Sequence, residues 1–301
     1  MEKSLKSGLY IVLLIFLTSF GLVILAVYLA GVLNLSIIFY LFFATLLSSA
    51  ISVTILGGLF TSLIGHLVHI RRFYRLDSLT NPLLLRLSSE APGTYHHSIL
   101  VANLASKAAK VVGADSLLCR VASYFHDIGK LKNPGFFIEN QPSYKNLNNI
   151  EAQLNSPLKN AQIIISHVAS GVEIANEAHL PKEVINIIAQ HHGNSTCIYF
   201  YEQARSKRVP DTKKSDYKYS GPKPQSKEAA IIMLADSLEA SARAKNGETD
   251  LKTLVEETFS DKINERQLSE SVLSQRDLFK LKKVFVENLE SILHPRIDYP
   301  K

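Results

Sequence analysis

The amino-acid sequence predicts an all-α protein in which an apolar two-helix hairpin precedes a helical soluble domain. Residues 8–70 contain no Asp, Glu, Lys or Arg, whereas residues 71–301 are densely charged. The charged part repeats apolar residues at helical spacing, and it lacks the strict polar–apolar alternation that is typical of half-buried β-strands. The two parts therefore belong in different physical surroundings.

The apolar part is long enough for two membrane spans. Residues 8–32 alone suffice for one spanning helix at about 1.5 Å rise per residue. The next uncharged run, 34–70, exceeds one span, so we predict a second span at about 35–58 and then an amphipathic helix. That run is interrupted by three glycines, Gly57, Gly58 and Gly65. A cleaved signal peptide fits poorly, because the first run is too long and a second follows at once. We assign residues 1–70 as a membrane anchor.

Basic residues flank both predicted spans and set the orientation. Lys3 and Lys6 precede the first span, and Arg71, Arg72 and Arg75 follow the second. The positive-inside rule then places both ends of the hairpin in the cytoplasm. We therefore expect a multi-pass protein of the plasma membrane whose charged domain is cytoplasmic.

The charge balance and the cysteines limit the classes of partner and compartment. The net charge is +6, and Glu2, Lys3 and Lys6 leave +1 in the first 70 residues, so the remainder carries +5. A mildly basic domain favours phosphates, nucleic acid or lipid head groups, although a solvated surface beside a membrane explains the charge equally well. The two cysteines, Cys119 and Cys197, lack a CxxC spacing and do not indicate a disulfide framework.

The charged part divides into a connector, residues 71–90, and a domain, residues 91–301. Helical periodicity predicts six helices, at 99–112, 117–127, 161–178, 182–192, 227–244 and 278–293. Two segments rich in Asn, Pro, Gln, Lys or Tyr, residues 133–158 and 206–226, are predicted to be loops.

Histidines and aspartates concentrate at the ends of these helices. His126-Asp127 taken alone would have a purely structural role more often than not. However, six of the ten histidines fall into four such positions: His96-His97, His126, His167 and His191-His192. Asp236 lies inside an apolar helix, where a carboxylate is costly unless it is paired or bound to a metal.

This mixture of imidazole and carboxylate groups indicates a metal site. It suits two divalent first-row cations, manganese or iron, with zinc as an alternative. Two such ions about 3.5–4 Å apart can hold both the attacking and the leaving oxygen of a phosphoryl transfer. The residues therefore indicate a metal-dependent phosphohydrolase.

The order His, His-Asp, His, His-His, Asp resembles that of the HD superfamily of metal phosphohydrolases. Longer motifs are similar to those of the seven-transmembrane-HD family. They are 90–98 (EAPGTYHHS), 124–130 (YFHDIGK), 133–141 (NPGFFIENQ), 190–193 (QHHG), 221–225 (GPKPQ), 233–236 (MLAD) and 294–297 (HPRI). The resemblance covers about residues 75–301 and also includes the second predicted span, which corresponds to the family's last membrane helix. It implies an HD-type helical domain, in bacteria, that hydrolyses cyclic di-AMP to linear pApA by means of a metal-bridging hydroxide.

The resemblance also implies the role of each site residue. One ion would be held by His97, His126, Asp127 and Asp236. Asp127 would bridge to a second ion, which His167, His191 and His192 complete. Lys130 would face the scissile phosphate as a point charge, and a surface lysine that closes its helix is the alternative.

The resemblance further implies the partners of the chain, and the chain differs from the family in two respects. We expect a cyclic dinucleotide, the lipid bilayer and a second copy of the chain as partners, and no nucleic-acid polymer. Family members carry five more membrane spans and a large extracytoplasmic domain, so this chain is expected to be a short form or a truncation. Residues 143–150 lack the histidine of an Asn-Pro-His segment in the family, which predicts altered substrate capture.

Two other functions remain open. The chain could act on another nucleotide, such as a guanine-based messenger or a dNTP, or it could be a nucleotide-binding sensor without turnover. The presence of every assigned ligand argues against the sensor. The motifs outside the ligands favour cyclic di-AMP.

Overall fold

The computed structural model describes residues 17–25, 27–28, 31, 35–141, 156–245 and 249–293. The predicted all-α class is confirmed: these residues form helices and turns, and their one β feature is an isolated bridge between Thr196 and Lys218. The chain divides into two compact units, residues 1–72 and 73–301.

In the first unit, one long helix carries most of the described residues. Helix α2, Leu35–Leu76, includes the predicted second span. Among the described residues, its segment Leu35–Gly65 is the one helix long and apolar enough to cross a membrane. About half of the predicted first span, 8–32, lies outside the described residues; within the described half, 17–25 and 27–28 are helical. The two-helix hairpin therefore stays a prediction.

The expected interruption of α2 at its glycines is wrong. The helix continues through Gly57, Gly58 and Gly65, and a Cβ atom at each of them would meet no other atom within 4 Å. A glycine costs only about 1 kcal/mol relative to alanine in a helix interior. It keeps its backbone N–H, so the hydrogen-bond ladder of a strongly apolar helix survives such residues.

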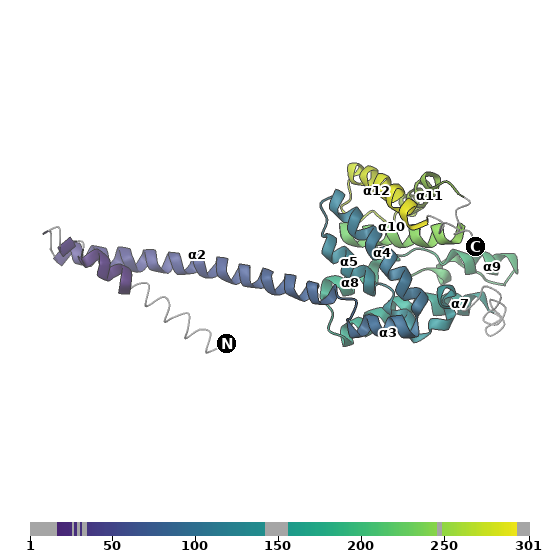
Figure 1. The fold of residues 1–301 in the computed structure, drawn as a ribbon, viewed down its shortest axis with the longest axis horizontal. Helices are drawn as coiled ribbons and strands as arrows, with labels where there is room; N and C mark the ends of the chain where they lie inside the picture. Colours follow the sequence, from purple (N-terminus) through teal and green to yellow (C-terminus); the bar gives the residue numbers. More distant parts are fainter. Residues whose placement is uncertain are drawn as a thin grey trace, which may run out of the picture. The chain divides into compact units, whose positions relative to one another are not determined.

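The second unit is a bundle of helices (Figure 1). It packs around a large apolar core, beside which Ala161, Ala204 and Tyr217 form a small second cluster. Its larger helices are α3 (Pro82–Glu90), α4 (Pro92–Val111), α5 (Ser116–Phe125), α7 (Pro157–Glu177), α8 (Lys182–Gln190), α9 (Ile198–Ser206), α10 (Lys227–Lys245), α11 (Leu251–Asn264) and α12 (Gln275–Leu293). Helix α10 packs against α4, α5, α8, α11 and α12. It is therefore central, which explains why Ile231, Ile232 and Leu234 are fully buried.

Six of these helices, α4, α5, α7, α8, α10 and α12, correspond to the predicted ones. Helix α4 begins at Pro92 rather than at Ile99, because proline is well suited to the first turn of a helix. Three helices, α3, α9 and α11, were not predicted. A signal for α11 was present, because Asp250 caps its N-terminus and the buried Leu254, Val255 and Phe259 have helical spacing.

Residues 71–90, which the sequence describes as a connector, contribute to the core. Phe73, Leu84 and Leu87 are buried in the same apolar cluster as the later helices. Asn81 caps α3 by accepting a hydrogen bond from the backbone N–H of Leu83.

The predicted loops are irregular where they are described. Residues 133–141 form two short 3₁₀ helices, η2 (Pro134–Phe136) and η3 (Ile138–Asn140), and residues 206–226 contain η5 (Lys214–Tyr217). The segment 143–150, which lacks the family's histidine, and the motif 294–297 lie outside the described residues.

A close crossing of two backbones joins the His-Asp pair to α7. The short helix η1, Ile128–Lys132, passes α7 at Gly129. A Cβ atom at Gly129 would lie 1.9 Å from the carbonyl oxygen of His167 and 2.4 Å from the backbone nitrogen of Gly171. Only glycine fits this crossing, which sets the spacing between Asp127 and His167.

We predict that Gly129→Ala strongly destabilises the domain, because two backbones must separate to admit one methyl group. Such overpacking typically costs about 1–3 kcal/mol and sometimes more, which lowers the melting temperature by about 2–4 °C per kcal/mol in a domain of this size. Gly135→Ala is the matched control, since a Cβ atom there meets nothing within 4 Å. Equal melting temperatures for the two variants, measured by circular dichroism, would show that the crossing is not tight.

Candidate metal centre

The seven side chains predicted as metal ligands come together at one place in the helical domain. His97 lies on α4, His167 on α7 and Asp236 on α10, whereas the other four follow directly after α5 and α8, namely His126, Asp127, His191 and His192. All are buried except His192, whose side chain is 24% exposed. Residues far apart in the sequence thus share one small volume.

The carboxylate of Asp127 stands between two groups of histidines. Its Oδ2 atom lies 3.5 Å from Nε2 of His97 and 3.3 Å from Nε2 of His126. Its Oδ1 atom lies 3.2 Å from Nε2 of His167 and 3.7 Å from Nε2 of His191. Each oxygen of the carboxylate therefore faces a different pair of imidazoles.

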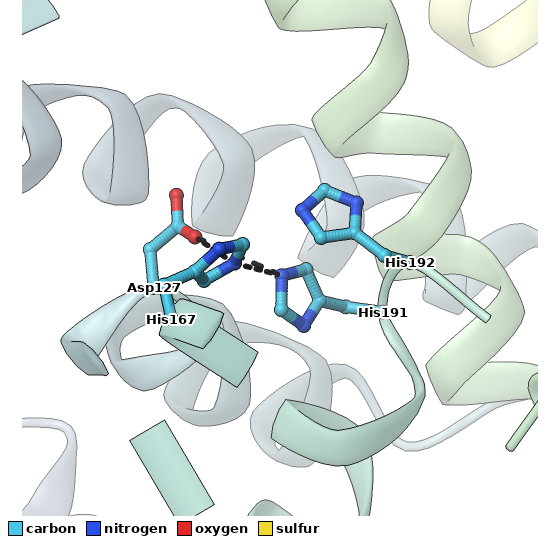
Figure 2. A group of neighbouring side chains, drawn as sticks. All are labelled: Asp127, His167, His191 and His192. Carbon is cyan, nitrogen blue, oxygen red and sulfur yellow. Dashed lines mark hydrogen bonds and ion pairs between the residues drawn. The ribbon is translucent and has the colours of Figure 1, made fainter. Parts of the chain in front are cut away.

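These contacts define two clusters that overlap at Asp127. The first cluster is His97, His126 and Asp127, and the second cluster is Asp127, His167, His191 and His192. Within each cluster the potential ligand atoms lie within 4.8 Å of one another. Figure 2 shows the second cluster, in which Asp127, just before η1, His167 on α7, and His191 and His192, just after α8, lie close together.

Asp236 completes the first cluster and reaches toward the second. Its Oδ1 atom lies 3.0 Å from Nε2 of His97 and 3.8 Å from Nε2 of His126. Its Oδ2 atom lies 3.8 Å from Nδ1 of His192. All seven predicted ligands thus belong to one continuous arrangement.

Backbone hydrogen bonds determine which ring nitrogen of three histidines carries the proton. The Nδ1 atoms of these rings lie 2.7 Å, 2.5 Å and 2.7 Å from the carbonyl oxygens of Ser123, Ile164 and Ile188, for His126, His167 and His191 respectively. A carbonyl oxygen only accepts, so each Nδ1 must donate a proton. In the neutral form of each ring, Nε2 then carries a lone pair that faces Asp127, as a metal ligand requires.

Two buried atoms at this point have no hydrogen-bond partner among the described residues. They are Nε2 of His126 and Oδ1 of Asp127. When His126 is neutral, both atoms present lone pairs and neither can satisfy the other, and an unpaired buried polar atom is costly. A divalent cation resolves this conflict, and the donor set is therefore compatible with divalent metal ions.

The first cluster is strongly electronegative. Burial opposes a charge on His126, but Asp127 and Asp236 outweigh it and raise the pKa of His126 to about 10. The pKa of His97 is also raised: burial lowers it, and the hydrogen bonds with Asp236 and Glu239 raise it by more. The first cluster therefore attracts positive charge, whether as a proton or as a metal ion.

The second cluster favours neutral imidazoles. Burial lowers the pKa of His191, and the neighbouring rings of His126 and His167 lower it further. Burial and His191 hold the pKa of His192 well below its ordinary value. Neutral rings need no deprotonation before they bind a cation.

Lys130 is part of the site rather than a surface lysine. Its Nζ atom lies 2.8 Å from Oδ2 of Asp127 and 2.7 Å from Oε1 of Glu139, and its side chain is 13% exposed. Burial lowers the pKa of Lys130, but these two carboxylates raise it by more. Lys130 is therefore a permanent positive charge beside Asp127.

Sequence analysis did not identify three residues at this site. Glu239 lies 2.5 Å from Nδ1 of His97, Glu139 binds Lys130, and the ring of Tyr219 lies 4.3 Å from that of His192. A signal was present for Glu239, which follows Asp236 on α10 at the i, i+3 spacing of a shared helix face. Glu139 and Tyr219 lie in irregular segments, where no periodicity indicates their position.

A pocket of about 710 Å³ opens over the two clusters. Four of the predicted ligands line it, namely His97, His167, His192 and Asp236, and α10 and α11 contribute further lining residues. The wall and rim carry aromatic and basic side chains, namely Phe137, Tyr219, Lys130, Arg243 and Lys262. The size is in the usual range for small-molecule sites.

Known proteins with a similar sequence carry the same domain. The family model of the HD domain matches residues 94–241. The chain is 43% identical over 232 residues to the cyclic-di-AMP phosphodiesterase PgpH of Bacillus subtilis strain 168, which covers 76% of this chain and 32% of that protein. The PgpH of Listeria monocytogenes serotype 1/2a strain 10403S is 39% identical over 244 residues, which covers 80% of this chain and 33% of that protein. The chain thus spans about a third of the length of these relatives.

A solved structure agrees with these sequence matches. The crystal structure of the L. monocytogenes phosphodiesterase PgpH HD domain in complex with cyclic-di-AMP superposes with a TM-score of 0.66 at 40% sequence identity. The match covers 73% of this chain and 100% of that domain.

We predict that divalent metal binding strengthens as the pH rises. His126, whose pKa is raised to about 10, holds a proton at neutral pH that a metal ion must displace, and the raised pKa of His97 favours its protonated form as well. Each proton released steepens the dependence by about tenfold in affinity per pH unit. Calorimetry of Mn²⁺ binding in buffers of different ionisation enthalpy should detect the released protons. An affinity that is constant between about pH 6 and pH 8 would contradict the electronegative first cluster.

Proposed function

Because the chain belongs to the HD-domain family, as a relative of the PgpH HD domains, we propose that it is a metal-dependent phosphodiesterase that hydrolyses cyclic di-AMP to linear pApA. The resemblance detected in the sequence is thereby confirmed. The observation that carries the proposal is the pair of ligand clusters that share Asp127, beside a pocket that His97, His167, His192 and Asp236 line.

We propose that the first cluster, with Asp236, holds one ion and the second cluster holds another. When bound, two such ions activate a water molecule and stabilise the charge that develops on a phosphoryl group. Asp127 would hold both ions, since each of its oxygens faces a different cluster. Among transition metals, manganese or iron suits this set of imidazoles and carboxylates, in which no thiolate takes part.

The residues around the clusters fit a dinucleotide. Lys130 lines the pocket and stays charged, so it can orient a phosphate by its point charge. Tyr219 and Phe137 present aromatic rings on which bases can stack. Arg243 lies farther along α10 and can bind a second phosphate. The substrate proposed here thus meets cationic and aromatic groups along one pocket.

Two alternatives give different outcomes in one experiment. Purified full-length chain in detergent is incubated with Mn²⁺ and, separately, cyclic di-AMP, cyclic di-GMP, a dNTP and a short RNA, and the products are separated by chromatography. We expect pApA from cyclic di-AMP at a rate that exceeds every other turnover. Faster turnover of another substrate would assign that substrate instead, and binding without any product would indicate a sensor.

We predict that Asp127→Ala abolishes this hydrolysis, because both ions lose their shared ligand. A rate loss of two or more orders of magnitude is expected, with metal content falling below that of the wild type. Glu173→Gln is the control, since Glu173 is exposed and pairs with Lys132 outside the site. Full activity of the Asp127→Ala variant would exclude a dinuclear mechanism centred on this carboxylate.

We also propose that residues 1–70 anchor the catalytic domain, residues 91–301, to the plasma membrane through the connector 71–90. Large apolar side chains such as Phe39, Leu47 and Leu63 are exposed along α2, which favours a lipid environment. A reporter fused after Lys301 should be active only as a cytoplasmic marker. An extracytoplasmic signal would contradict this topology. Crosslinking in membranes tests the predicted homodimer.

A further inference from the structure

A buried carboxylate that neither metal cluster includes lies beside the first cluster. Glu239 on α10 is 4% exposed, and its Oε2 atom lies 2.5 Å from Nδ1 of His97. Asp236 contacts the opposite nitrogen of the same ring, with Oδ1 at 3.0 Å from Nε2. Residues three apart lie on one face of a helix. Helix α10 therefore holds the imidazole of His97 between two carboxylates.

This environment distinguishes His97 from the other histidines whose Nδ1 bonds are described. Those of His126, His167 and His191 donate to backbone carbonyls, which are neutral acceptors. The Nδ1 of His97 donates to a carboxylate instead. Hydrogen bonds to ionised acceptors are shorter and roughly twice as strong as neutral ones. Because the bonded carboxylate increases the electron density on Nε2, the ring becomes a stronger ligand.

Glu239 has a second partner at the pocket. The Nη2 atom of Arg243 lies 3.4 Å from its Oε2 atom, one helical turn further along α10, and Arg243 lines the pocket. This cation compensates part of the cost of burying the carboxylate. His97 and Arg243 thus both contact the Oε2 atom of Glu239, and together they fix its orientation.

We propose that Glu239 is a positioning residue that raises the metal affinity of the first cluster above that of the second cluster. It does so by fixing the Nδ1–H tautomer and the ring orientation of His97 and by supplying a negative charge that the second cluster lacks. The inference rests on the proposed two-metal site, and it assigns the difference in affinity between the two ions to one side chain.

The test measures stepwise Mn²⁺ binding to the full-length chain by electron paramagnetic resonance, which counts free Mn²⁺. Glu239→Gln keeps the size of the side chain and removes its charge. We expect one of the two dissociation constants to rise about 10- to 100-fold. His97→Ala and His191→Ala identify which binding step belongs to which cluster. Glu228→Gln is the matched control, because Glu228 lies on the same helix and accepts a hydrogen bond from the backbone N–H of Asp115, away from the site.

Each outcome of the binding test decides the inference. Weakening confined to the step that His97→Ala removes supports it. Unchanged dissociation constants, an equal rise of both, or a rise confined to the step that His191→Ala removes would overturn it. If the wild-type chain binds one ion only, the proposed two-metal function fails, and the effect of Glu239→Gln on that single constant still decides whether Glu239 supports metal binding.

A second measurement does not depend on the folding of the glutamine variant. In the zinc-loaded wild-type chain, selectively labelled histidine should show one imidazole N–H proton resonance far downfield of the others. We assign it to Nδ1 of His97 by its absence from His97→Ala, and we expect Glu228→Gln to retain it. The absence of such a resonance in the wild type would overturn the inference, because the short hydrogen bond would not exist in solution.

Discussion

The buried carboxylate of Asp127 is the group around which the helical domain is organised. A carboxylate in such a place is costly unless opposite charges or hydrogen bonds compensate it. Lys130 supplies one compensating charge, at 2.8 Å from Oδ2. The Nε2 atoms of the imidazoles on both sides face the carboxylate oxygens. A cation between them, either a proton or a metal ion, supplies the remaining compensation. The helices that provide them must therefore end at, or pass, the same point.

Local backbone rules put the ligands into a state that can bind a metal. His126 and His191 directly follow the ends of α5 and α8, where the last carbonyl groups of a helix lack intrahelical partners. Their ring N–H groups use these carbonyls, and the opposite nitrogens then point to Asp127. At Gly129 the absence of a side chain lets η1 contact α7, and His167 on α7 therefore lies beside Oδ1 of Asp127. The backbone at the ends of α5 and α8 thus decides which ring nitrogen of these histidines carries the proton.

The two clusters share a ligand but differ in charge. Asp127, Asp236 and Glu239 surround His97. In the second cluster three imidazoles share Asp127, Asp236 reaches only His192, at 3.8 Å, and the pKa values of His191 and His192 are lowered. A cation in the first cluster therefore meets more negative charge. In the proposed two-metal site, this asymmetry would make the first cluster the tighter one.

The sequence by itself determined the all-α class, six of the helices and the set of side chains that meet at the site. Each depends on a local pattern: helical periodicity, residue type and the order of histidines and aspartates. Helices α3 and α9, the continuity of α2 through its glycines and the positions of Glu139 and Tyr219 did not follow from such patterns. The tertiary structure alone decided that Lys130 is buried, which oxygen of Asp127 faces which histidines, and that Glu239 meets His97. The physical reason is that periodicity shows which face of a helix is buried but not which other helix that face contacts, and contacts between distant residues are set only when the helices pack.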